Sequence, residues 1–287
     1  MDASIQQGLL SPPVLALLGL CIGSFLNVVV HRLPQMLERG WKVDSAEMLG
    51  LDPAKAASLA EPMTLSRPRS RCPSCGHMIA WHENIPLLSY LRLGGKCSAC
   101  KTRISLRYPL VELLTAVLFA AVGWRFGTQP VALLWCGFVA VLVALAAIDW
   151  DTTLLPDDLT LPLLWAGLVA SALGWTIALP QALWGAVAGY LSLWSVYWMF
   201  KLATGKEGMG HGDFKLLAAL GAWLGWQMVL PVVLGASVLG ALVGLAMKSS
   251  GALREGRYVP FGPFLAGSGV VVLLAGYGRV LDWLGWT

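Results

Sequence analysis

The sequence predicts an all-α polytopic membrane protein, with about eight transmembrane helices and a cytoplasmic zinc-binding insertion after the first helix. The composition supports this fold class: 57% of the 287 residues are hydrophobic and only 13% are charged, whereas a soluble globular domain has roughly 25% charged residues. Fourteen tryptophans and a mean hydropathy of +0.68 agree with it. The third observation is a pair of Cys-x-x-Cys motifs in the most basic part of the chain.

Eight apolar stretches are suited to cross a bilayer, which takes about 20 apolar residues in a helix. They lie at 9–30, 108–126, 130–148, 159–179, 181–200, 214–228, 229–247 and 261–284. We expect the first stretch to remain as a membrane helix, because it has no basic n-region and no small-residue cleavage pattern follows it. It is also longer than the apolar stretch of about 7–15 residues in a signal peptide.

The basic residues predict the orientation of these helices. Twelve of the 20 Lys and Arg residues lie between Arg32 and Arg107. If this segment is cytoplasmic and the N-terminus is outside, six more basic residues fall at inside positions and only Arg125 and Arg279 fall outside. The positive-inside rule expects this bias. It explains the basic segment more simply than nucleic-acid binding, so no nucleic-acid partner is expected.

The basic segment holds two Cys-x-x-Cys pairs, Cys72 with Cys75 and Cys97 with Cys100, separated by 21 residues. This spacing is typical of a four-cysteine structural zinc site, in which four thiolates leave no open position for water. Disulfide bonds are the alternative, and the reducing cytosol disfavours them. We therefore expect a first transmembrane helix at 1–31, a zinc-binding domain at 32–107 and a membrane-embedded domain at 108–287.

Other cysteines and histidines are not expected to bind this metal. Cys21 and Cys136 fall inside predicted spans and are interpreted as small buried hydrophobic residues. His77 and His82 lie between the two cysteine pairs, and with four cysteines available we interpret them as neighbours of the site.

Carboxylates gather at two points that the topology places at the same cytoplasmic level. Asp149, Asp151, Asp157 and Asp158 follow the third span, and Asp213 ends the sequence Gly-Met-Gly-His-Gly-Asp. Two carboxylates that share a proton can act as general base and general acid, and so hydrolyse a peptide bond without a nucleophile or a metal. Asp213 is one candidate, and spacing leaves Asp149 and Asp151 open as its partner. Asp157 and Asp158 are interpreted as N-cap residues of the next helix.

Other chemistries have weaker support. No Gly-x-Ser-x-Gly elbow predicts a serine mechanism, and the glycine-rich stretch lacks the Gly-Lys-Ser/Thr ending of a phosphate-binding loop. His211 is interpreted as a solvated or pH-tuning neighbour of Asp213. Two other functions remain open: a proton- or ion-coupled transporter that relays protons through membrane carboxylates, and a membrane scaffold that binds partners through the zinc module. The acidic residues cluster at one face, with Glu112 the one candidate mid-span acid, and this argues against the transporter.

Several motifs together resemble a known family, the bacterial type IV prepilin peptidases. These are bifunctional leader peptidases and N-methyltransferases of the Gly-x-Gly-Asp aspartyl protease group. The motifs that carry the resemblance are Gly23–Val28, His31–Pro34, Ser70–Cys75, Asn84–Pro86, Gly95–Cys97, Ile104–Pro109, Ile148-Asp149, Pro156-Asp157 and Gly210–Asp213.

The resemblance implies a catalytic pair, Asp149 and Asp213, and so decides between Asp149 and Asp151. It implies that the enzyme cleaves the leader peptide of type IV prepilins and type II secretion pseudopilins, between a glycine and usually a phenylalanine. The new α-amino group is then methylated by S-adenosyl-L-methionine. The family's cysteines map onto the four named above, which assigns domain 32–107 to zinc and methyl transfer and domain 108–287 to the aspartyl peptidase.

The resemblance also implies a multi-pass protein of the bacterial inner membrane, in contact with lipid, with its active site facing the cytoplasm and its N-terminus in the periplasm. No Rossmann-type glycine fingerprint marks the site of the methyl donor. Glu83, Asn84, Gly95 and Lys96 are the candidates for binding it. The glycines at 208, 210 and 212 are expected to let an extended substrate strand lie against the backbone.

Overall fold

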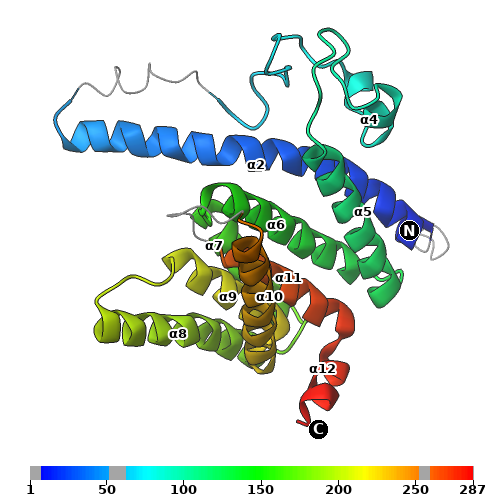
Figure 1. The fold of residues 1–287 in the computed structure, drawn as a ribbon. Helices are drawn as coiled ribbons and strands as arrows, with labels where there is room; N and C mark the ends of the chain where they lie inside the picture. The colour runs from blue at the N-terminus through cyan, green and yellow to red at the C-terminus, as the bar shows by residue number, and fades with distance from the viewer. Residues whose placement is uncertain (1–7, 52–62, 252–258, 287) are drawn as a thin grey trace. The chain divides into compact units, whose positions relative to one another are not determined.

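The structure is a computed structural model that describes residues 8–51, 63–251 and 259–286. The chain forms two compact units, a first unit at Met1–Ala132 and a second unit at Leu133–Thr287. Throughout the described ranges the regular elements are helices (Figure 1). The β structure in these ranges is limited to two isolated bridges, one between Arg71 and Met78 and one between Lys96 and Arg103. The prediction of an all-α protein is therefore confirmed.

The first unit is built on two long helices, α2 (Pro12–Met48) and α5 (Arg107–Phe126). With 37 residues, α2 is about 55 Å long, far longer than the roughly 30 Å hydrocarbon core of a bilayer. The predicted span ended at residue 30, where charged residues begin, but the helix continues without a break because water also supports a polar helix. The segment predicted as an insertion therefore begins as an extension of the first helix.

The two helices run antiparallel and touch through glycines. A Cβ added to Gly19 would lie 2.7 Å from Cα of Ala116, and one added to Gly23 would lie 2.7 Å from Cα of Glu112. One turn further along α2, the side-chain amide of Asn27 donates to the backbone oxygen of Tyr108, at 3.1 Å. Only residues without a side chain allow this approach, as in other membrane helix pairs.

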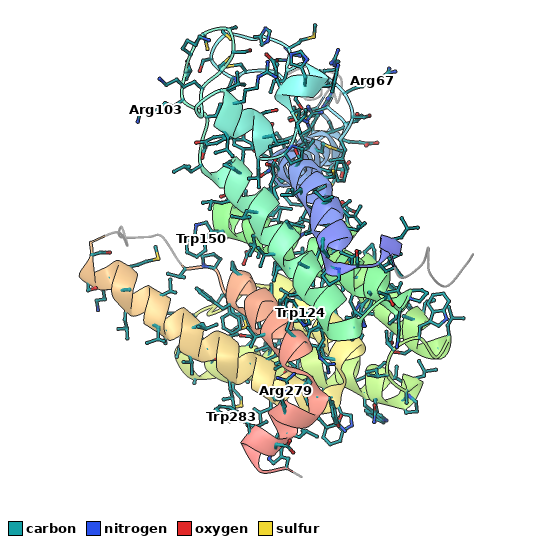
Figure 2. The ribbon with its side chains drawn as sticks, turned by 90° about the vertical axis from the view of Figure 1, so that its right-hand side faces the viewer. Arg67, Arg103, Trp124, Trp150, Arg279 and Trp283 are labelled. Carbon is teal, nitrogen blue, oxygen red and sulfur yellow. The ribbon has the colours of Figure 1, made fainter. Side chains whose placement is uncertain are left out.

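Residues 63–106 form a part of the first unit that we call the cysteine module. It contains two short helices, η1 (Trp81–Glu83) and α4 (Leu88–Arg92). Figure 2 shows Arg67 and Arg103 of the module at one end of the first unit, and Trp124 of α5 towards the other. The buried guanidinium of Arg32 ties α2 to the start of the module, because it donates to the backbone oxygen of Thr64 at 2.9 Å.

The second unit packs its helices around one short helix, α9 (His211–Leu224). Every residue of α9 from Asp213 to Leu224 is buried except Lys215, as expected of a helix that is apolar on all sides. The elements of the second unit besides α9 are α6 (Val131–Thr152), α7 (Asp157–Ala172), α8 (Leu179–Thr204), η2 (Trp226–Met228), α10 (Val229–Ser249), α11 (Gly262–Ala275) and α12 (Tyr277–Leu284).

The contact between α8 and α9 depends on glycines. A Cβ on Gly185 would overlap the backbone carbonyl of Gly221, and a Cβ on Gly189 would overlap that of Leu217. The sequence Gly-x-x-x-Gly at residues 185–189 therefore serves helix packing. In the similar sequence at residues 240–244, Gly240 lies against the Phe264 ring, but Gly244 has no atom within 4 Å of an added Cβ.

A helix or a helix pair occupies each of the eight stretches predicted to span the membrane. Among the described residues, four helices are long and apolar enough to cross a bilayer: α2, α5, α6 and the helix at Trp226–Ser249. The pair α11–α12 makes a fifth if it counts as one span. This pair bends by 102° where Gly276 has φ +88°, so the predicted span at 261–284 is a bent helix pair.

Two of the remaining helices, α7 and α9, have only 16 and 14 residues. Both are shorter than the roughly 20 residues of a full span. The chain is thus a helical membrane protein, and the count of eight spans stays a prediction.

Candidate active site

The two proposed catalytic aspartates both lie in the second unit, at the ends of two helices. Asp149 belongs to the last turn of α6, and Asp213 to the first turn of α9. Only 5% of Asp149 and 8% of Asp213 is exposed, and aspartate is rarely buried so completely without a reason. Gly212, next to Asp213, and Gly262, whose N–H binds Asp149, both lie against Leu155. The structure therefore brings together two acids that are 64 residues apart in the sequence.

The position of Asp149 differs slightly from the prediction. The third span was expected to end before Asp149, but α6 continues to Thr152, whose hydroxyl donates to the backbone oxygen of Ile148 at 2.8 Å. Asp149 is therefore held on a regular helix and not on a loop. A side chain on a helix is positioned more exactly than one on a loop, which suits a catalytic group.

Asp149 accepts a hydrogen bond from the backbone of a third helix. The N–H of Gly262, the first residue of α11, donates to Oδ2 of Asp149 at 3.0 Å. A Cβ at this position would lie 2.5 Å from the same oxygen, so only glycine permits the contact. The first N–H groups of a helix have no partner within it and are free to bind an acid. Sequence reasoning missed Gly262, although a glycine directly before Pro263 at the start of an apolar stretch was an available signal.

Leu155 joins the three segments that carry the site. A Cβ on Gly212 would lie 2.8 Å from Cβ of Leu155, and a Cβ on Gly262 would lie 3.2 Å from its Cδ1. The residues just before Asp213 and the residue that binds Asp149 therefore pack on one buried side chain. Contacts with one side chain therefore fix the backbone next to both acids.

An ion pair adds a second connection between α7 and α9. Nζ of Lys215 lies 2.7 Å from both carboxylate oxygens of Asp157. The interpretation of Asp157 and Asp158 as N-cap residues is wrong: the N-cap of α7 is Pro156, and both acids belong to the first helical turn. There they favour the helix through its dipole.

The structure separates the two acids between which spacing did not decide. Asp149 is buried and faces Gly262, whereas Asp151 is exposed. Two residues along a helix correspond to a rotation of about 200°, so these side chains leave α6 on different faces. The buried one of the two is Asp149, the residue that the family resemblance implied.

Side chains near the end of α8 hold the segment that leads into α9 by a salt bridge, a hydrogen bond and ring contacts. Nζ of Lys201 lies 2.8 Å from Oε1 of Glu207, and the hydroxyl of the buried Tyr197 donates to the same oxygen at 3.3 Å. The ring of Tyr197 also packs against His211 and Phe214, with centroid distances of 5.1 and 5.7 Å. His211 is exposed and stacks in this aromatic group.

The four cysteines of the module converge on one point. The Sγ atoms of Cys72, Cys75, Cys97 and Cys100 all lie within 4.8 Å of one another, and those of Cys72 and Cys100 are 3.8 Å apart. A tetrahedral zinc ion with Zn–S bonds of about 2.3 Å requires S···S separations of about 3.8 Å. The donor set and its geometry therefore fit a metal ion. His77 bonds instead to Glu83, at 3.3 Å.

Each cysteine pair lies on a tight turn of the backbone. The oxygen of Cys72 accepts from the N–H of Gly76 at 2.9 Å, and the oxygen of Cys97 accepts from that of Lys101 at 3.1 Å. The turns place Gly76 and Lys101 at φ +72° and +60°. Two similar turns facing each other explain why residues so far apart in sequence form one cluster.

The candidates for binding the methyl donor have structural contacts within the module. Hydrogen bonds from the Ser98 side chain and the Ala80 N–H lower the pKa of Glu83 to about 2, so this carboxylate is ionised and already paired. The N–H of Asn84 donates to the oxygen of Trp81 at 3.1 Å.

Gly95 and Lys96 form the turn that leads into the second cysteine pair. Gly95 has φ +68°, and a Cβ there would lie 2.8 Å from the Tyr90 hydroxyl. Lys96 forms an isolated bridge with Arg103. The structure therefore places all four candidates in the framework of the cysteine module.

The fold and these sites define a class of protein: a helical membrane protein with a buried aspartate pair and a separate four-cysteine cluster. Two family models match the chain. The model described as "Bacterial Peptidase A24 N-terminal domain" covers residues 17–126, and the one described as "Type IV leader peptidase family" covers residues 136–245. These matches fall in the first and the second unit respectively.

Curated relatives extend the match over almost the whole chain. A prepilin leader peptidase/N-methyltransferase from Pseudomonas aeruginosa is 55% identical over 91% of this chain and 89% of its own length. Proteins of the same name from Stutzerimonas stutzeri and Aeromonas hydrophila are 54% and 53% identical, over 90% and 91% of this chain and 89% of each relative. No solved structure matches the chain.

The chain belongs to the type IV leader peptidase family. The resemblance inferred from its motifs is confirmed, including the similarity to a pseudomonad enzyme. Because the family is one of peptidases, the chain is an enzyme. The transporter and scaffold alternatives are therefore rejected.

Proposed function

We propose that this protein removes the leader peptide of type IV prepilins and type II secretion pseudopilins, and then methylates the new N-terminal residue. The observation that carries the peptidase part is the buried pair of Asp149 and Asp213, with Asp149 held by the N–H of Gly262. The names of the curated relatives, which print both activities, support the combination.

The pair suits hydrolysis by a directly activated water. The N–H of Gly262 donates to Asp149, and this favours Asp149 as the carboxylate that removes a proton from water. Asp213 then carries the proton that is given to the scissile carbonyl oxygen. The tetrahedral intermediate collapses when the amine leaves with a proton, and the pair returns to its starting state.

The location of the reaction follows from the helices and the basic residues. We place the enzyme in the inner membrane, with its aspartates at the cytoplasmic face and its N-terminus in the periplasm, because of the bias of basic residues towards one side. The substrate is itself a membrane helix surrounded by lipid, so its scissile bond lies near the interface.

The cysteine module would hold a structural zinc ion through Cys72, Cys75, Cys97 and Cys100. Four thiolates leave no position for substrate or water, so the ion would stabilise the fold of the module. We assign methyl transfer to the first unit, which contains the segment 32–107, and peptide cleavage to the two aspartates of the segment 108–287. A variant with Cys72→Ser and Cys97→Ser should lose its bound metal in elemental analysis, and unchanged metal content would contradict the assignment.

The methyl donor, S-adenosyl-L-methionine, would supply an electrophilic methyl group. Glu83, Asn84, Gly95 and Lys96 remain the proposed residues around it. Their contacts indicate that they act by shaping the module: Glu83 is already paired with His77 and the Ala80 N–H.

The decisive experiment compares Asp149→Asn and Asp213→Asn with Asp151→Asn in the full-length enzyme. The first two changes keep the side-chain volume but remove the acid, so cleavage of a prepilin should fall to background. Methylation of a pre-cleaved pilin, measured in parallel, should persist. Asp151→Asn is the matched control and should retain both activities. Normal cleavage by either of the first two variants would show that the assigned pair is wrong.

A further inference from the structure

A third buried carboxylate, Glu112 of α5, lies outside the proposed catalytic pair. It lies in the first unit, whereas both catalytic aspartates lie in the second. Only 8% of Glu112 is exposed, and the helix that carries it is apolar enough to span a membrane. An ionisable residue in such a helix is costly to bury and usually has a function.

The surroundings of Glu112 place it where the two long helices meet the cysteine module. Oε2 of Glu112 accepts a hydrogen bond from the N–H of Leu87 at 2.9 Å. Leu87 precedes α4 and has φ +56°, a positive φ that is uncommon outside glycine. On the other side, the backbone of Gly23 on α2 lies directly against Glu112. Neither neighbour titrates.

The charge of Glu112 is not neutralised by a cation among the residues that the structure describes. Among the described residues, the side-chain hydrogen bond of Glu112 is with the Leu87 N–H, whereas Lys42 pairs with Glu38 and His77 with Glu83. The buried Arg32 instead donates to the backbone oxygens of Thr64 and Leu65. A carboxylate has about four acceptor positions, and one N–H fills only one of them. Glu112 can therefore still bind a positively charged group.

We propose that Glu112 binds the α-ammonium group of the cleaved substrate and accepts its proton during methyl transfer. This inference rests on the proposed function. The ammonium stands at the tip of an apolar segment, and Glu112 lies near the start of α5, at the end of that helix that adjoins the cysteine module. Glu112 is also linked, through Leu87, to the stretch that contains Glu83 and Asn84.

The chemical requirement for such a residue is direct. An ammonium nitrogen has no lone pair, so one N–H bond must break and its proton must pass to a base before the nitrogen can react. In this proposal the proton goes to the Glu112 carboxylate. The free amine then forms a bond to the donor methyl carbon, while the bond from that carbon to sulfur breaks and its electron pair stays on sulfur.

Glu112→Gln separates this role from a structural one. The glutamine carbonyl can still accept from the Leu87 N–H and fills the same volume, but it carries no charge and binds no proton. Methylation of pre-cleaved pilin at pH 7 by the full-length enzyme should fall by roughly 100-fold, the lower end of what a general base contributes. Prepilin cleavage by the same preparation should stay at the wild-type rate.

The pH profile supplies a readout that a structural role would not change. A free α-amino group has a pKa of about 8, so between pH 7 and 9 the fraction of neutral amine rises by about tenfold. The defect of Glu112→Gln should shrink by a similar factor over this range, and Glu112→Asp should retain more activity than Glu112→Gln. Glu38→Gln, which changes an exposed acid on α2, is the control and should leave both activities intact.

Three results would have separate meanings. Wild-type methylation by Glu112→Gln would overturn the inference. A loss of methylation that is equal at every pH and comes with loss of bound metal would overturn it too, because it would show that Glu112 only supports the fold. A wild-type enzyme that cleaves but does not methylate would instead refute the methyl-transfer part of the proposed function.

Discussion

Gly262→Ala should impair cleavage by displacing Asp149, although no side chain is removed from the active site. The added Cβ would lie 2.5 Å from Oδ2 and 3.2 Å from Cγ of Asp149. Since non-bonded carbon atoms prefer separations of roughly 3.5 Å or more, the carboxyl group must move by about 1 Å. This movement also breaks the hydrogen bond from the Gly262 N–H, which is 3.0 Å long.

Two independent estimates of the effect agree. A misplacement of about 1 Å in a catalytic group can lower the rate by roughly 100-fold. A hydrogen bond to a charged group contributes about 1.5–3 kcal/mol, which corresponds to a factor of roughly 10–100 in rate if it is lost at the transition state. We therefore expect the kcat of prepilin cleavage to fall between these limits, and methylation of pre-cleaved pilin to remain.

The matched control is Gly267→Ala on the same helix. Gly267 is exposed, and an added Cβ there meets no atom within 4 Å. Alanine also favours helix over glycine by about 1 kcal/mol, so this variant should fold and cleave as the wild type does. If Gly262→Ala cleaves at the wild-type rate, or if Gly267→Ala is equally impaired, the reasoning about Asp149 is refuted.

Three further predictions concern the metal and the glycines. Removal of bound metal with a chelator should unfold the cysteine module and abolish methyl transfer, while prepilin cleavage persists; loss of both activities would contradict separate sites. Gly95→Ala should reduce methyl transfer more than Gly94→Ala, since both residues have positive φ but only Gly95 lies against Tyr90; equal effects would mean that backbone strain alone matters. Gly212→Ala should lower the thermal stability because its Cβ overlaps Leu155, whereas Gly210→Ala meets no atom within 4 Å. If Gly210→Ala still lowers cleavage in a stable protein, the surface at Gly210 serves the substrate.

Helix positions could be predicted from the sequence, because an apolar stretch in a membrane must satisfy its backbone hydrogen bonds within itself. The residues at which the helices end could not be predicted. The first helix continues to Met48 because a helix can leave the bilayer without any change of backbone. The last predicted span breaks at Gly276, a residue that many helices tolerate, so the bend depends on the packing of α11 and α12.

The cysteine cluster illustrates a site that sequence predicts well. Each Cys-x-x-Cys pair defines its own turn, and two such turns need only meet to complete the donor set. The aspartate pair is different. Asp213 was recognisable among its glycines, but Asp149 and Asp151 have the same local surroundings, and only the rotation of α6 decides which of them is buried.

By itself, then, the sequence determined the membrane fold, the cysteine cluster and the region of each proposed catalytic acid, since composition and short-range spacing encode these properties. Only the tertiary structure decided which groups meet: Gly262 with Asp149, 113 residues apart, and Leu87 with Glu112, 25 residues apart. In both cases the donor is a backbone N–H. Every residue other than proline carries one, so no residue type marks it in the sequence, and its partner is set by how the helices pack.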